Sequence, residues 1–193
     1  RSGQRREFDG WADYTRYVRV LEKAGAIRDA SFLWWVMRPS MKYPTLELRV
    51  ADSCTRLSDA IGIAALYRCL VRLLVREPAL NQGLTGASRA IVAENLWRVQ
   101  RNGSRADLIE EADESTASVA DRLAMVLAHV AEDADALGCG PALDALRGIV
   151  SVGTSADRQI AIVDAAQSQG RRAREALNDT VDWLAAATTS STP

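Results

Sequence analysis

The chain has 193 residues and a mass of 21.0 kDa, enough for one ordinary domain. Hydrophobic residues make up 48% and charged residues 25%, which is the composition of a globular protein rather than of a disordered one. The 24 basic and 25 acidic side chains nearly balance, so no overall positive charge points to a nucleic acid or an anionic membrane as partner. One histidine, His129, and three scattered cysteines argue against a His-rich zinc site, a Ser-His-Asp triad and a disulfide scaffold.

Residues 1–193 show no recognisable pattern of a secretory signal or a membrane span. Its charged first residues are not followed by the apolar segment of a secretory signal. The longest apolar stretch, residues 57–75, is interrupted by Arg68 and Arg72, which argues against a membrane span. We therefore expect a reducing, cytoplasmic setting. Because the chain opens without Met on a polar segment, we also expect it to be a piece of a longer protein.

Charge is distributed unevenly along the chain. Residues 1–50 carry 10 basic and 6 acidic groups, whereas residues 101–193 carry 8 basic and 15 acidic groups. The basic residues 1–50 are also rich in aromatic and strand-forming residues, which indicates that this N-terminal segment binds anions. The acidic part has helical patterns, and its charges are typical of a solvated helix surface.

The first fifty residues predict a helix followed by two strands. Asp9 is a candidate N-cap for a helix over 11–21, and Gly25 is its candidate stop. Residues 31–38 are dense in aromatic and apolar types, as in a strand buried on both faces. Residues 45–52 alternate between aliphatic and charged side chains, so we expect a second strand with an aliphatic core face. A short connector between the two strands predicts an antiparallel hairpin.

The rest of the chain predicts helices, so the fold class is α+β and mostly helical. Apolar periodicity and Gly or Pro punctuation place the expected helices at 57–76, 87–102, 115–137, 141–150, 155–169 and 173–187. Residues 188–193 are expected to be a disordered tail. Two strands leave unpaired edges, so we expect the hairpin to complete a larger antiparallel sheet whose other strands lie upstream of residue 1.

Candidate chemistry gathers on this hairpin. Glu47 and Arg49 are two apart on the second strand, so their side chains leave the same face. A carboxylate is a hard ligand for Mg²⁺, and a guanidinium can hold phosphate oxygens in a bidentate grip. Arg38 closes the preceding strand and Lys42 lies in the connector. The spacing by itself is equally typical of an ordinary ion pair on a solvated sheet face.

The run 34–52, WWVMRPSMKYPTLELRVAD, resembles the signature W-W-x-x-R-P-S…T-[LIV]-E-[LIV]-R-[LIV]-x-D of the glutamate–cysteine ligase type 2 family of carboxylate–amine ligases. Further blocks are similar to that family in order and spacing: Thr55-Arg56 with the helix at 64–68, AENLWRVQRNG at 93–103, GTSADRQ at 153–159 and VDWL at 181–184. The family begins with a G-x-E-x-E strand that this chain lacks. The resemblance therefore implies that residues 1–187 form the C-terminal half of a single ligase catalytic domain with a sheet of the glutamine synthetase and glutamate–cysteine ligase type.

The resemblance also implies a reaction. Family members use MgATP to phosphorylate a substrate carboxylate, and an amine such as that of cysteine then attacks the acyl phosphate to form an amide. Glu47 would be a Mg²⁺ ligand, and Arg38 and Arg49 would contact phosphate or carboxylate, with Lys42 as a further anion contact. Expected partners are small amino acids, the upstream half of the same enzyme and a second copy in a homodimer.

Several other residues have a functional and a structural interpretation. Asn95 and Arg98 could bind the nucleotide, although Glu94 and Arg98 are also spaced for an ordinary i,i+4 ion pair. Asp157 is typical of the first turn of a capped helix. Trp34 and Trp35 are expected in the core.

Two hypotheses of different classes remain open. The first is an ATP-dependent ligase that is inactive as this fragment alone. The second is a helical interaction module, a relative that has lost catalysis and keeps the hairpin as scaffold. The joint presence of Arg38, Glu47 and Arg49 favours the first hypothesis, and the missing upstream carboxylates favour the second.

Overall fold

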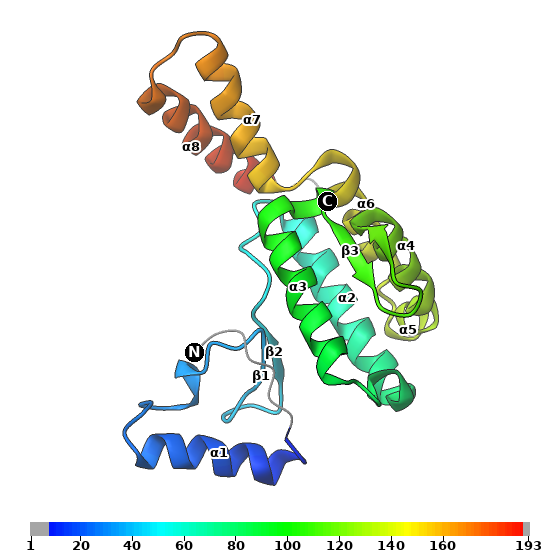
Figure 1. Ribbon diagram of the computed structural model, residues 1–193. Coiled ribbons are helices and arrows are strands. Elements are labelled where there is room, and N and C mark those ends of the chain that lie inside the picture. Colours follow the sequence, from blue (N-terminus) through cyan, green and yellow to red (C-terminus); the bar gives the residue numbers. More distant parts are fainter. Residues whose placement is uncertain (1–7, 191–193) are drawn as a thin grey trace. The chain divides into compact units, whose positions relative to one another are not determined.

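A computed structural model describes residues 8–190 of the chain. The chain divides into two compact units, the first ending at Asp52 and the second beginning at Ser53. Figure 1 labels their helices and strands. Among the described residues, no helix combines the length and the apolar character that crossing a bilayer requires.

The first unit contains one long helix, a short 3-10 turn and a hairpin. In chain order these elements are α1 (Trp11–Lys23), η1 (Ala30–Phe32), β1 (Met37–Pro39) and β2 (Leu46–Leu48). One face of α1 packs on the segment that leads to the hairpin, and the buried core consists of Tyr14, Val18, Ile27, Ala30 and Leu33. Aromatic rings extend this small core, because Phe8, Tyr14, Tyr17 and Trp35 stack or meet edge to face.

The predicted first helix is confirmed, but its cap is wrong. Gly10, not Asp9, is the N-cap residue, and because glycine has no side chain, no side-chain hydrogen bond caps this helix. The predicted stop is correct, since Gly25 follows the last turn with a φ of +65°, a conformation that glycine adopts without steric cost.

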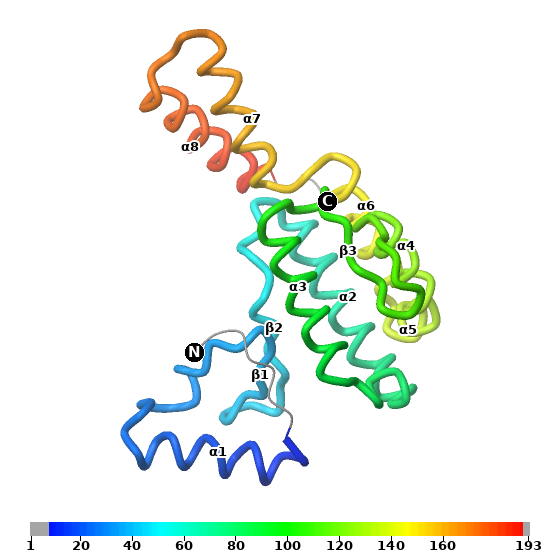
Figure 2. The backbone as a smooth tube through the Cα atoms, viewed as in Figure 1, coloured from blue at the N-terminus to red at the C-terminus, as the bar shows by residue number. Residues whose placement is uncertain are grey.

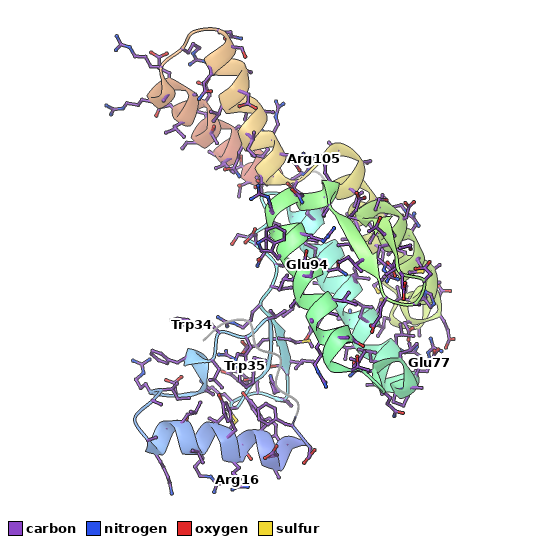
Figure 3. All side chains as sticks on the ribbon, viewed as in Figure 1. Arg16, Trp34, Trp35, Glu77, Glu94 and Arg105 are labelled. Carbon is purple, nitrogen blue, oxygen red and sulfur yellow. The ribbon has the colours of Figure 1, made fainter. Side chains whose placement is uncertain are left out.

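The predicted strand over 31–38 is wrong for most of its length. The carboxylate of Asp29 accepts a 2.8 Å hydrogen bond from the Ser31 amide and so caps the 3-10 turn η1. Regular pairing begins only at Met37. Trp34, labelled with Trp35 in Figure 3, is 59% exposed, so the expectation that both tryptophans are buried holds only for the half-buried Trp35.

The predicted antiparallel hairpin is confirmed. β1 pairs with β2 in a register that sets Arg38 opposite Glu47. The aliphatic face of β2 is not the core face that we expected, because Leu46 is 39% exposed and Val50 is 45% exposed. Each sheet within residues 8–190 has two strands, so the larger antiparallel sheet stays a prediction.

The body of the second unit is a group of packed helices. Its long helices are α2 (Leu57–Arg76) and α3 (Gly86–Asn102), separated by the 3-10 turn η2 (Pro78–Asn81), and both were predicted within one residue. The shorter helices are α4 (Val119–His129), α5 (Ala131–Leu137) and α6 (Gly140–Val152). Helices α2 and α6 approach closely, because a Cβ added at Gly62 would lie 2.9 Å from the backbone oxygen of Ala142.

A buried carboxylate ties α5 to α2. Asp133 is fully buried in the second unit and accepts hydrogen bonds from Arg72 and from Arg76, the latter at 3.1 Å. The hydrogen bond from Arg76, followed by that from Arg72, holds the pKa of this carboxyl below its usual range despite the opposing effect of burial. Asp133 is therefore a buried anion whose charge is met by two guanidinium groups.

The predicted helix over 115–137 is wrong at its start and in its middle. After α3 the chain forms the 3-10 turn η3 (Gly103–Arg105) and the strand β3 (Asp107–Glu110). Residues Ser115–Ser118 form the strand β4, which pairs with β3. Ser118 then caps α4 by accepting a hydrogen bond from the Asp121 amide, so the helix begins four residues later than predicted. At the buried Val130 the helix breaks, although the apolar period continues through it.

The last two helices form a hairpin, drawn in orange and red in Figure 2. They are α7 (Ser155–Ser168) and α8 (Ala173–Thr189), and both were predicted. The interpretation of Asp157 as cap architecture is confirmed, because Thr154 and Asp157 form a reciprocal capping box at the start of α7. Thr188 and Thr189, within the expected tail, belong to α8, and residues 191–193 lie outside the described residues.

Candidate functional site

The strand pairing brings three of the predicted site residues together. Arg38 on β1 faces Glu47 on β2 across the ladder, and Arg49 follows two residues later, so all three side chains project on one side. Glu47 Oε2 accepts a hydrogen bond from Arg38 Nη2 at 2.6 Å and from Arg49 Nη1 at 3.2 Å. One carboxylate oxygen is thus shared by two guanidinium groups.

The two arginines differ in how firmly the protein holds them. Arg38 has only 7% of its side chain exposed, and its Nη1 also donates to the backbone oxygens of Ala30 at 2.8 Å and Leu33 at 3.2 Å. Its guanidinium is therefore anchored to the turn η1 as well as to Glu47. The Arg49 side chain is 37% exposed, and the contact with Glu47 at its Nη1 is its one ion pair among the described residues. Of the two arginines, Arg49 is therefore the more accessible to solvent.

A tyrosine on α1 supports this arrangement. The Tyr14 hydroxyl donates a 3.0 Å hydrogen bond to the backbone oxygen of Pro39, at the end of β1. Burial raises the pKa of Tyr14; the charge of Arg38 lowers it and the charge of Glu47 raises it. The phenol is therefore protonated at neutral pH and ties α1 to the hairpin. Nothing in the residue spacing signals this long-range bond.

A concave surface of about 420 Å³ opens beside the pair. Arg38, Lys42 and Glu47 all line it, so the structure brings Lys42 to the same cavity. Two further carboxylates, Glu22 and Asp29, lie in its wall. The Lys42 ammonium lies 5.2 Å from the centre of the Tyr43 ring. The cavity wall thus holds cations and carboxylates together, a combination that suits the ammonium and carboxylate groups of a zwitterionic molecule such as an amino acid.

The remaining predicted contacts, Asn95 and Arg98, lie on α3 in the second unit. Asn95 Nδ2 donates to the Ile109 oxygen at 2.9 Å, and the Ile109 amide donates to Asn95 Oδ1 at 2.7 Å. Arg98 Nε donates to Glu94 Oε1 at 3.0 Å, which confirms the ordinary i,i+4 ion pair; Figure 3 labels Glu94. Both side chains therefore hold α3 to its own surroundings, and their role as nucleotide contacts stays a prediction.

These residues do not by themselves make a Mg²⁺ site. Glu47 is the one predicted metal ligand, and the oxygen described above already accepts from two cationic groups, which compete with a metal ion for its charge. Among residues 8–190, no group of three or more Asp, Glu, His or Cys side chains is arranged to hold a metal.

Comparison with known proteins identifies the relatives of this chain. Residues 3–182 match the family described as Glutamate-cysteine ligase family 2. The chain is similar to proteins that carry the name "Putative glutamate–cysteine ligase 2": it is 42% identical to one from Bradyrhizobium diazoefficiens over 98% of this chain and 42% of that protein. It is 41% identical to one from Rhodospirillum rubrum, over 97% of this chain and 48% of that protein. The chain thus spans less than half the length of these relatives.

Proposed function

The chain belongs to glutamate–cysteine ligase family 2, and on that premise we propose that it supplies the anion-binding hairpin of an ATP-dependent carboxylate–amine ligase. In the proposed reaction, a substrate carboxylate oxygen attacks the γ-phosphorus of ATP and ADP leaves. The amine nitrogen then attacks the acyl carbon, phosphate leaves, and the nitrogen loses a proton. The product is an amide of the γ-glutamyl-cysteine kind.

The observation that carries the proposal is the shared carboxylate. Glu47 lies between a buried, anchored arginine and a half-exposed one. Arg38 fixes the position of the carboxylate, and the carboxylate in turn orients the Arg49 fork. A guanidinium held in place before the substrate arrives can stabilise charge on a transferring phosphoryl group without further rearrangement. Because the chain matches a ligase family, we assign the pair of Glu47 and Arg49 to phosphate or carboxylate binding and not to an ordinary surface ion pair.

The residues then have distinct proposed roles. Arg49 contacts the phosphate or carboxylate directly, and Lys42, on the wall of the adjacent cavity, supplies a second cation. Arg38 acts by holding Glu47 and the turn η1 in place. Mg²⁺ that accompanies ATP requires oxygen ligands beyond Glu47, and we propose that these come from the upstream half of the enzyme and from the nucleotide. The homodimer and the cytoplasmic setting stay predictions.

The second hypothesis, a helical interaction module without catalysis, has its own support. Glu47 already has its charge compensated by two arginines, and Asn95 and Arg98 are used in contacts that hold α3 to β3 and its neighbours. The same contacts would serve a scaffold. The two hypotheses differ in whether Glu47 and Arg49 affect turnover or only stability.

Amino-acid-dependent ADP release tests the proposal. The chain is assayed alone and in a chimera in which it replaces the matching segment of the Rhodospirillum rubrum relative, with that relative as positive control. We expect no turnover by the chain alone and turnover by the chimera with glutamate and cysteine. In the chimera, Glu47→Gln should lower turnover at least about 100-fold, in line with the loss of one preorganised charged group at such a site.

The matched control is Glu94→Gln, which removes a carboxylate that also pairs with an arginine, here on α3. We expect it to leave turnover within about twofold, because an exposed i,i+4 pair contributes little. An inactive chimera beside an active relative, or equal effects of the two substitutions, would contradict the ligase assignment of Glu47.

A further inference from the structure

Two cysteines meet in the core of the second unit, apart from the residues of the proposed reaction. The Sγ atoms of Cys69 and Cys139 lie 3.4 Å apart. Cys69 projects from the middle of α2, and Cys139 is the residue that precedes α6. They are 70 residues apart in the sequence, so only the packing of α2 against α6 brings them together.

The packing around Cys69 and Cys139 holds the two sulfur atoms close together. Cys69 is fully buried among the apolar side chains of α2, α4, α5 and α6. The close approach of these helices at Gly62 and Ala142 fixes the backbones that carry the two sulfurs. Cys139 is only half-buried, so a small reagent has access to one of the two sulfurs.

We propose that Cys69 and Cys139 are a modification site, which a low-molecular-weight disulfide converts to an intramolecular disulfide and a thiol reductant restores. A disulfide needs the two sulfurs about 2.05 Å apart, so the 3.4 Å contact must close by a little over 1 Å. In the proposed closure, side-chain rotation at both cysteines and a small shift of the residue that precedes α6 supply this movement.

The exchange proceeds in two balanced steps. The Cys139 thiolate attacks one sulfur of the reagent, here bis(2-hydroxyethyl) disulfide, and one 2-mercaptoethanol leaves as its thiolate and takes up a proton. The Cys69 thiol then gives its proton to solvent, its sulfur attacks that of Cys139, and a second 2-mercaptoethanol leaves. The two protein thiols lose two electrons and two protons, and the reagent gains them.

The order of the steps follows from the environments of the two sulfurs. Burial, together with the neighbouring Cys139 and Asp133, raises the pKa of Cys69 to about 11. Little Cys69 thiolate exists at neutral pH, and the reagent does not reach it. We therefore expect fast formation of the mixed disulfide at Cys139 and slower closure.

The test treats the 193-residue chain with bis(2-hydroxyethyl) disulfide and counts free thiols after unfolding. The count should fall by at least the two thiols of Cys69 and Cys139, any mixed disulfide at the half-buried Cys54 being counted separately by its added mass, and dithiothreitol should restore all three. Peptide mapping should recover a Cys69–Cys139 crosslink. Because the crosslink closes a long loop in the unfolded chain, Tm should rise by about 5–10 °C.

Two variants separate this result from general oxidation. Cys54→Ser should still form the crosslink. Cys139→Ser should lose both the crosslink and the rise in Tm, and it should fold, because serine is well suited to the residue before a helix. A persistent mixed disulfide at Cys139, a bond between two chains, or an unchanged count of three thiols would each overturn the proposal.

Discussion

The unequal anchoring of the two site arginines leads to a sharp prediction about stability. Arg38→Lys keeps the positive charge but replaces a fork of donors with a single ammonium. The wild-type guanidinium donates to two backbone oxygens at 2.8 and 3.2 Å and to Glu47 at 2.6 Å. A lysine at the same place can keep about one of these bonds. Two acceptors in the interior of the first unit then lose a charged donor.

The magnitude follows from the number of bonds and their burial. A hydrogen bond from a charged group contributes about 1.5–3 kcal/mol, so the loss of two should lower the free energy of unfolding of the first unit by about 3–6 kcal/mol. Arg49→Lys is the matched control, because it makes the same substitution against the same carboxylate with 37% of the side chain exposed. Its single bond should cost less than about 0.5 kcal/mol.

The assay is urea unfolding of the two variants and the wild type, followed by near-ultraviolet circular dichroism. The stacked rings of Phe8, Tyr14 and Trp35 report on the first unit. Because a unit of this size has only a few kcal/mol of stability, Arg38→Lys is expected to lose the aromatic signal even without urea. A cost below about 1 kcal/mol, or equal costs for the two substitutions, would refute the view that Arg38 is an anchor.

Three further predictions concern the second unit. Gly62→Ala should destabilise the second unit by about 1–3 kcal/mol, because the new methyl group would lie 2.9 Å from a backbone oxygen of α6. Gly148→Ala is the control, because a methyl group there meets open space and should stabilise α6 by about 0.5–1 kcal/mol. Thermal unfolding of the two variants measures the difference. The pKa of Asp133 is lower in the folded chain than in the unfolded chain, so this carboxylate stabilises the fold above about pH 4, and the stabilisation is lost as the pH falls through the folded pKa. Asp133→Asn should therefore lower Tm at pH 7. In this variant, Tm should also decrease less between pH 7 and pH 3 than in the wild type. Asn95→Ala should cost about 1–3 kcal/mol in urea unfolding, since it leaves both backbone groups of one β3 residue without their partner, and a cost near zero would contradict the contact.

The helices that the sequence predicts well are those with a clear local start or stop signal. α2 ends before Pro78, α3 ends at Gly103, and Thr154 with Asp157 starts α7. Where local signals conflict, the prediction fails. The apolar period begins at Val119, after β4 and its cap, and continues through the break at Val130, because periodicity reports which face is buried and not whether the backbone stays helical.

The sequence likewise predicts some parts of the candidate site and not others. The alternation of β2 and the family signature identify Glu47 and Arg49, and the hairpin register adds Arg38. The anchors of Arg38 could not be predicted, since they are backbone oxygens whose positions depend on the turn that Asp29 caps. The contact from Tyr14 depends likewise on how α1 packs on the hairpin. Sequence spacing thus identifies the charged groups, while the groups that orient them come from tertiary structure.

We propose that the hairpin serves the transfer of a phosphoryl group to a carboxylate. The most direct test uses glutamate labelled with ¹⁸O in its carboxylates, together with cysteine, ATP and the chimera described above. An acyl phosphate passes one carboxylate oxygen to the released phosphate when the amine displaces it. We expect ¹⁸O in the phosphate, and its rate of appearance should fall with Glu47→Gln. Amide formation with unlabelled phosphate would contradict an acyl phosphate intermediate.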